Sequence, residues 1–198
     1  MWKYIFVFIT LFMNIVSTLN YIPNKCIRDL YKLWHPGQLY TLEHVVPKSI
    51  IHNSNYTKDM HNILWLPSLI NNHRDNYKFV NALDLNDYVT FLDIFGNKLK
   101  DFDHNDKDLS CIYLKSNMRR EFVPIKNNKG KIARACMYFI KTYPEYKNII
   151  FEKVIDMELA NTWHYENPPT RFEILKNRNI CKYQGNLNLF IENPRLYI

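Results

Sequence analysis

The alternation of apolar and polar residues in the first half of the chain predicts two short strands followed by a helix. The strands are expected at 40–46 and 63–66, and the polar stretch 52–60 joins them. Ser68 is a suitable N-cap for a helix that runs to about Val80. The order strand, strand, helix is therefore the first structural expectation.

Helical spacing of apolar residues predicts further helices at 27–34, 131–142, 146–163 and 168–183, the last behind an Asn167 cap. Residues 88–95 fit a strand. The charged run 98–108 fits a solvated loop better than a metal site. Because no linker, repeat or low-complexity block interrupts the chain after its start, the pattern predicts one α+β domain over residues 21–198.

The first twenty residues differ from the rest of the chain. A positive Lys3 precedes the apolar run 4–16, and Ser17 and Thr18 are small residues suited to cleavage, so residues 1–20 are predicted to be a signal peptide. A membrane anchor is the alternative, but the apolar run is shorter than the roughly 20 residues that cross a bilayer. We therefore expect a secreted or periplasmic monomer with no membrane association after removal of the leader.

Composition and charge narrow the class of partner. The chain has 47% apolar and 23% charged residues, which is typical of a globular protein. Its 26 Lys and Arg residues minus 19 Asp and Glu residues give +7, and +6 once Lys3 leaves with the leader. Such a surplus favours polyanionic partners, either nucleic acid or an anionic membrane. The competing interpretation is that the net charge only keeps the protein soluble. None of the four glycines builds a phosphate-binding loop, which argues against Walker-type ATPases and dinucleotide-dependent dehydrogenases.

The cysteines leave two alternatives open. An even number in an exported chain permits two disulfide bonds, and free buried thiols are the other interpretation. No pair has the CxxC spacing of a structural zinc site. The triplet Asn55-Tyr56-Thr57 is an acceptor pattern for N-glycosylation and a weak sign of an exposed loop. The four cysteines are Cys26, Cys111, Cys136 and Cys181.

The residues best suited to chemistry fall within the predicted strand, strand and helix, in segments 41–49, 59–62 and 71–79. Adjacent strand residues point to opposite faces, so Glu43 and His44 can face one ligand only if the strand bends. Pro47 fits a strand that ends early.

These segments resemble the endonuclease I family of ββα-metal (His-Me finger) nucleases, which are secreted or periplasmic enzymes. The family has a Glu-His pair with Pro three positions after the His, an Asp-x-His-Asn before the next strand, and an Asn-x-x-Arg-x-Asn-x-x-Phe helix. The chain carries these in order at 43–47, 59–62 and 71–79, with further matches at 122–124, 130–135, 163–164 and 184–191. It departs from the pattern at Leu187 and Leu189 and has no arginine in the short loop after Lys48.

The resemblance implies an α+β fold with a ββα-metal core surrounded by helices, His44 as general base, and Glu43 and Asn76 as ligands of one divalent cation. A neutral imidazole can take a proton from water. Carboxylate and amide oxygens suit Mg²⁺ best, with Mn²⁺ and Ca²⁺ as alternatives. The second ring nitrogen of His44 is expected to donate to a carbonyl within 62–66.

Other polar residues receive smaller roles. Lys48 and Arg74 are candidates for phosphate contact, although Arg74 could equally be a buried fork that holds loops together. His61 and His73 are interpreted as structural or supporting, and Asp59 as a turn or capping residue. The remaining matches, Arg134, Trp163 and the segment 184–188, are expected to serve packing and loop geometry.

The leading hypothesis is a secreted, metal-dependent, largely sequence-nonspecific endonuclease that hydrolyses DNA, with RNA as a possible second substrate, to 5′-phosphates. A catalytically weak or inactive nucleic-acid-binding protein on the same scaffold is the alternative. A membrane-binding or glycan-binding effector is a third, which the basic charge alone allows.

Overall fold

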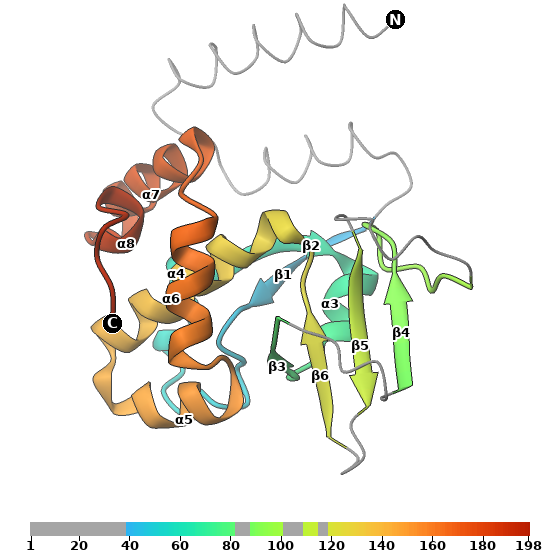
Figure 1. Cartoon of the computed structure of the whole chain (residues 1–198). Helices are drawn as coiled ribbons and strands as arrows, with labels where there is room; N and C mark the ends of the chain where they lie inside the picture. The colour runs from blue at the N-terminus through green and yellow to red at the C-terminus, as the bar shows by residue number, and fades with distance from the viewer. Residues whose placement is uncertain (1–38, 82–87, 101–108, 115–118) are drawn as a thin grey trace, which may run out of the picture. The chain divides into compact units, whose positions relative to one another are not determined.

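The computed structural model describes residues 39–81, 88–100, 109–114 and 119–198, and Figure 1 shows their arrangement. Nearly all of them belong to one compact unit, Thr41–Ile198. The predicted leader 1–20, the helix predicted at 27–34 and most of the charged run 98–108 lie outside the described residues. The boundary at residue 20 therefore stays a prediction.

The two predicted strands are confirmed as β1 (Tyr40–His44) and β2 (Ile63–Pro67), which form a two-stranded sheet followed by α3 (Ser68–Arg74). The predicted end of the helix at Val80 is wrong. Asp75 adopts a positive φ of 49°, which ends α3 at Arg74. Asn76 therefore lies in a turn just after the helix rather than on it.

A second sheet has the order β3-β6-β5-β4 and is built from β3 (Lys78–Phe79), β6 (Arg120–Val123), β5 (Ser110–Leu114) and β4 (Tyr88–Leu92). Strands β3 and β6 are parallel, and the other neighbours are antiparallel. The strand predicted at 88–95 ends at Leu92 because the Asp93 carboxylate accepts backbone N–H bonds from Phe95 and Asn97 and so forms a turn.

Helices cover the remainder of the described chain. The predicted helix 131–142 is confirmed and begins earlier, as α4 (Lys126–Thr142). The single helix predicted at 146–163 is wrong, because Val154 leaves the helix and its carbonyl accepts from the Phe79 N–H of β3. Asn167 ends α6, and Thr170 caps the next helix by accepting from Glu173 N–H. The helices after α4 are η3 (Pro144–Tyr146), α5 (Lys147–Lys153), α6 (Met157–Glu166), α7 (Arg171–Gln184) and α8 (Leu189–Glu192).

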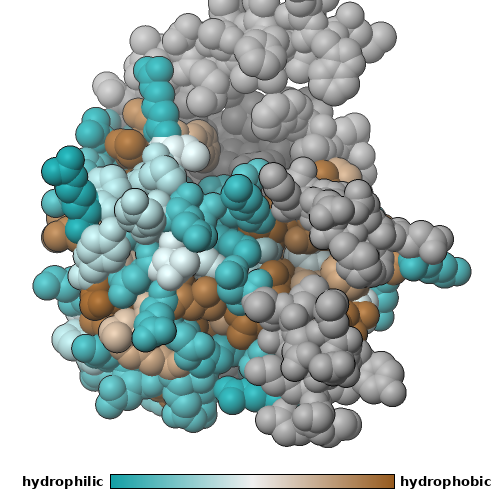
Figure 2. All heavy atoms as spheres, in the orientation of Figure 1, coloured by the Kyte–Doolittle hydropathy of each residue, from teal (hydrophilic) through white to brown (hydrophobic). Residues whose placement is uncertain are grey.

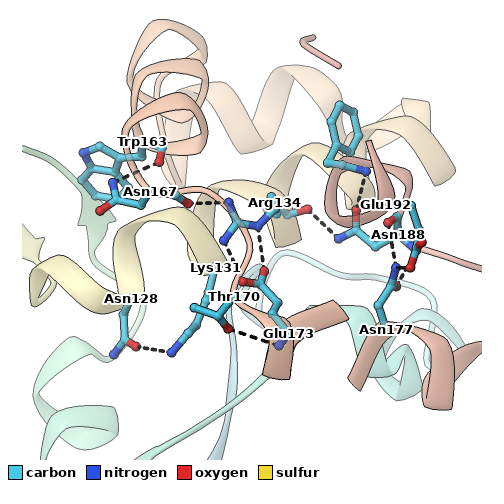
Figure 3. Close-up of polar contacts among 11 residues, drawn as sticks. Asn128, Lys131, Arg134, Trp163, Asn167, Thr170, Glu173, Asn177, Asn188 and Glu192 are labelled. Atoms are coloured by element: carbon cyan, nitrogen blue, oxygen red, sulfur yellow. Dashed lines mark hydrogen bonds and ion pairs between the residues drawn. The ribbon is translucent and has the colours of Figure 1, made fainter. Parts of the chain in front are cut away.

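Helix α4 forms the centre of the core, and α6 packs across it (Figure 1). The buried Arg134 of α4 ties three segments together (Figure 3): Nε and Nη2 donate to the Glu173 carboxylate, and Nη1 donates to Asn167 O. Asn188 Nδ2 in turn donates to Arg134 O. Arg134 and Asn188 therefore serve packing and loop geometry, as the sequence indicated.

The described cysteines are free. Cys111 and Cys136 are buried and Cys181 is partly buried, and no disulfide joins any two of them. Two disulfide bonds among four cysteines would need one bond between two of these three, so the alternative with two disulfides is wrong. The alternative of free buried thiols holds for Cys111 and Cys136, where burial raises the pKa of each thiol to about 12. Cys26 lies outside the described residues.

The surface of the described residues is mixed. Hydrophilic side chains predominate on the face shown in Figure 2, with hydrophobic side chains visible between them. Among the residues that the structure describes, no helix is both long and apolar enough to cross a bilayer.

Candidate active site

A buried ion pair lies at the point where β1 meets α3. Arg74 Nη1 is 2.7 Å from Glu43 Oε1, and the two side chains are 1% and 5% exposed. The guanidinium also lies over the Phe79 ring, 4.4 Å from its centroid. The stacking and the pairing together compensate for the burial of the Arg74 charge.

Besides its ion pair with Glu43, the Arg74 guanidinium donates to three main-chain carbonyls. Nη1 donates to His44 O at 3.2 Å and to Asp75 O at 3.1 Å, while Nη2 donates to Val45 O at 2.8 Å. Glu43 Oε1 is buried and makes its close contact with the same Nη1, at 2.7 Å. Of the two interpretations of Arg74, this geometry favours the buried fork over a phosphate contact.

Burial raises the pKa of Glu43 to about 7, although the neighbouring Arg74 lowers it. The carboxylate therefore lacks much of the stabilisation that water would give to its charge. A cation bound beside it would favour the ionised form, and this is one observation by which the residues present fit a metal ion.

His44, the last residue of β1, is only partly buried. Its Nε2 lies 2.9 Å from Thr57 O in η1 (Tyr56–Lys58). A carbonyl only accepts, so Nε2 carries the proton and the neutral ring keeps its lone pair on Nδ1. The expected acceptor within 62–66 is thus wrong: the loop between the strands folds back and supplies the carbonyl instead. Burial lowers the pKa of His44. The bond to Thr57 O opposes this shift, and the nearby Lys48 adds to it.

In the motif at 71–79, most of the residues named in the sequence hold the structure together, and one side-chain amide is free. Asn71 Nδ2 donates to Thr41 Oγ1 at 2.9 Å and to Leu42 O at 3.3 Å, which fastens α3 to β1. Arg74 and Phe79 form the stacked fork described above. Asn76 is exposed and makes no hydrogen bond to another described residue, so its amide oxygen is available to a ligand.

The supporting residues have structural partners. Asp59 caps η2 (Met60–Asn62) by accepting from His61 N–H, which confirms its interpretation as a capping residue. His61 is buried, and its Nε2 donates to Asn186 O at 3.1 Å. Asn62 is fully buried, accepts from Val46 N–H and donates to Val46 O, which holds the end of β1 against the start of β2. Lys48 is exposed beside His44, and His73 is half-buried.

The donor set fits a hard divalent cation bound mainly through water and substrate. Glu43 provides a buried carboxylate, and the exposed Asn76 provides an amide oxygen. No group of three or more His, Cys, Asp or Glu side chains within the described ranges could hold a metal ion. A zinc-type site of imidazoles and thiolates is therefore not part of what the structure describes.

The sequence indicated Glu43, His44 and Arg74, because a carboxylate, an imidazole and a guanidinium are groups able to perform or support such chemistry. It missed Thr57, whose contribution is a main-chain carbonyl that any residue could supply, and no sequence signal would have found it. It also missed the clamp made by Asn71, which the motif contains but whose partner on β1 only the fold reveals.

Comparison with known proteins agrees with this arrangement. No curated protein matches the chain significantly. A profile of the endonuclease I family matches residues 14–195, nearly the whole chain, including the segments that carry Glu43, His44 and Asn76. A match of this extent, over a mixed α+β fold with a strand, strand and helix around Glu43 and His44, shows that the protein belongs to the endonuclease I family.

Proposed function

We propose that the protein is a metal-dependent, largely sequence-nonspecific endonuclease that hydrolyses phosphodiester bonds of DNA and leaves 5′-phosphates. Membership of the endonuclease I family makes it a nuclease with nucleic acid as substrate. Dependence on a metal ion, the kind of nucleic acid and the residue roles are the finer parts of the proposal.

The hydrogen bond between His44 and Thr57 O is the observation that carries it. It holds the proton on Nε2 and leaves Nδ1 unprotonated, which is the form that a general base needs. The lowered pKa of His44 keeps that form populated at neutral pH.

In the proposed reaction His44 Nδ1 accepts a proton from the water that attacks phosphorus. Glu43 and Asn76 would hold one divalent cation, Mg²⁺ in the first place, which when bound stabilises charge on the phosphate and on the departing 3′ oxygen. Arg74 keeps the backbone of His44 and Val45 fixed, so the base and the acidic ligand retain their relative positions.

Substrate binding is proposed to rely on phosphates rather than on bases. Lys48 is exposed beside His44 and is the candidate for a direct phosphate contact. The net charge of +6 calculated without Lys3 supports attraction of any polyanion. RNA is therefore a second candidate substrate. Export through a signal peptide at 1–20 also remains part of the proposal.

Incubation of the purified protein with plasmid DNA and with RNA, each with and without EDTA, tests the proposal. Cleavage of DNA that EDTA abolishes and added Mg²⁺ restores is expected. His44→Ala is expected to reduce cleavage by at least ~10²-fold while the fold and DNA affinity remain, because the change removes a proton acceptor and no binding charge.

The same assay separates the alternative, a nucleic-acid-binding protein without catalysis. That protein would retain DNA without cutting it under any metal condition. Near wild-type turnover by folded His44→Ala would instead show that the protein is a nuclease in which His44 is not the base.

A further inference from the structure

The carbonyl that holds His44 belongs to a loop with its own anchor. We use the name acceptor loop for residues 52–60, which contain η1 and Thr57. The Thr57 side chain bonds only within this loop, donating from Oγ1 to Ser54 O at 2.7 Å. The position of Thr57 O therefore depends on what fastens the rest of the acceptor loop to the molecule.

The carboxylate of Asp59 fastens one end of the acceptor loop. Asp59 Oδ2 accepts from the hydroxyls of both Tyr138 and Tyr143 at 2.8 Å. Asp59 Oδ1 accepts from His61 N–H at 2.9 Å and from Gln184 Nε2 at 2.8 Å. Asp59 is 4% exposed, so these four bonds lie largely out of water, where such a network is rigid.

The ring of Tyr143 fastens the other side of Thr57. Tyr56, the residue before Thr57, stacks on Tyr143 with ring centroids 4.1 Å apart and an interplanar angle of 23°. Tyr143 follows the last turn of α4, and its ring also packs against Phe139 of that helix. One side chain thus holds both Tyr56 and Asp59, the residues that flank Thr57 and Lys58.

We propose that Tyr143 is a positioning residue for the nuclease reaction: through Tyr56 and Asp59 it fixes Thr57 O, and through that carbonyl it fixes the His44 ring. The inference rests on the proposed role of His44 as base. It extends that role to a side chain that is not part of the family motifs quoted above and that we do not expect to touch substrate.

The physical reason is that a general base works only when its lone pair is aimed at the water it deprotonates. A shift of a few tenths of an ångström in Thr57 O lengthens the bond from Nε2 and lets the imidazole rotate. Outer residues that hold a ring nitrogen in this way commonly change activity by roughly 10- to 100-fold when they are replaced. Substrate affinity should not change, because the acceptor loop's anchor carries no phosphate contact.

Two variants of Tyr143 separate the contribution of its ring from that of its hydroxyl group. Tyr143→Phe keeps the ring stack on Tyr56 and removes the hydroxyl that donates to Asp59, and Tyr143→Leu removes both. Ile180→Val is the control, because Ile180 is a buried residue of α7 that takes no part in the hydrogen bonds and ring contacts of the anchor, and trimming it lowers stability. Each protein is measured for kcat and KM on DNA at saturating Mg²⁺.

The second readout does not need activity. The Nε2 proton of His44 is hydrogen-bonded to Thr57 O, so its exchange with water is slowed and its resonance can be followed by ¹H–¹⁵N NMR. The resonance is assigned by its absence in His44→Gln. The Nε1 proton of Trp163, which donates to Asn81 Oδ1 and has no bond to the acceptor loop, serves as the internal reference.

We expect Tyr143→Leu to lower kcat by roughly tenfold with KM within about twofold, and to speed exchange of the His44 proton. Tyr143→Phe should give smaller changes of the same kind. Ile180→Val should change neither kcat nor the exchange of the His44 proton. Unchanged kcat and unchanged His44 exchange in folded Tyr143→Leu overturn the inference. If that variant does not fold, the same unchanged result in Tyr143→Phe overturns it. A wild-type protein that cuts no nucleic acid would instead contradict the proposed function.

Discussion

The guanidinium of Arg74 stabilises the backbone that presents Glu43 and His44. Its three carbonyl partners, the oxygens of His44, Val45 and Asp75, belong to the end of β1 and to the turn after α3. The bend at the end of β1 therefore has a specific side chain that satisfies its carbonyls. Arg74 thus fixes this backbone and also opposes the burial that raises the pKa of Glu43.

The pH dependence of cleavage follows from the environment of His44. Because burial lowers the pKa of His44, the neutral base persists to lower pH than in a free histidine. Activity should therefore be level near neutrality and fall on the acid side with a midpoint below 6.5, the ordinary value for histidine. The measurement is kcat/KM against pH at saturating Mg²⁺, since cation binding competes with protonation of Glu43. A midpoint at or above about 7 would contradict the assignment.

Residue identities could be predicted only where the side chain itself has the chemical character that a site needs. Glu43, His44 and Asn76 stand out in the sequence because carboxylate, imidazole and amide have limited uses in such a motif. Thr57 could not be predicted, since its main-chain carbonyl is common to every residue type. Tyr143 could not be predicted either, because its link to Asp59 joins positions 84 residues apart in the chain.

At the scale of elements, α4 and the end of α6 approach closely at Gly130. A Cβ built at Gly130 would lie 2.2 Å from Asn167 O, the acceptor that Arg134 Nη1 also uses. The crossing of the two segments therefore requires a residue without a side chain. Arg134 and Glu173 then extend the contact from this crossing to α7 (Figure 3).

Gly130→Ala should destabilise the protein although alanine is the better helix former. The propensity gain is about 1 kcal/mol at most, whereas relief of the backbone clash should cost roughly 1–3 kcal/mol or more. Denaturant unfolding followed by circular dichroism measures the difference. Lys126→Ala, at an exposed position in the first turn of the same helix, is the matched control and should change stability by less than about 0.5 kcal/mol. Equal stability of the two variants would refute the tight crossing.

Elements were predictable where local pattern agreed with tertiary contacts. Strands β1 and β2 follow from their apolar runs. The predicted helix 146–163 failed because Val154 bonds to β3, a strand of two residues that no local pattern reveals. Strands β5 and β6 were missed for a similar reason: their pairing partners, rather than their own alternation, make them strands.

At the scale of the whole molecule, the excess of basic residues determines how the protein binds nucleic acid. Lys and Arg outnumber Asp and Glu by 26 to 19, and only some of the lysines and arginines are used in internal pairs such as Arg134 with Glu173. The remaining charge favours contact with any phosphate backbone through release of counterions. No feature of the site described here reads a base.

DNA binding should therefore be sensitive to salt and insensitive to sequence. Using His44→Ala to prevent cleavage, the dissociation constant should rise by at least ~10-fold between roughly 50 and 200 mM salt. Unrelated duplexes of equal length should bind within a few-fold of each other at one salt concentration. Fluorescence anisotropy provides both values. A difference of roughly a hundredfold between sequences would show that bases are read after all.

The central claim is that Glu43 and Asn76 hold a cation while His44 moves a proton. It is tested most directly by titrating cleavage with Mg²⁺ and Mn²⁺ in the wild type, Glu43→Gln, Asn76→Ala and His44→Ala. With only two protein ligands, each lost ligand is a large share of the binding, so the first two variants should regain activity at higher metal concentration. His44→Ala should stay inactive at every concentration, because added cation cannot replace a proton acceptor. Identical metal curves for His44→Ala and Asn76→Ala would contradict the account.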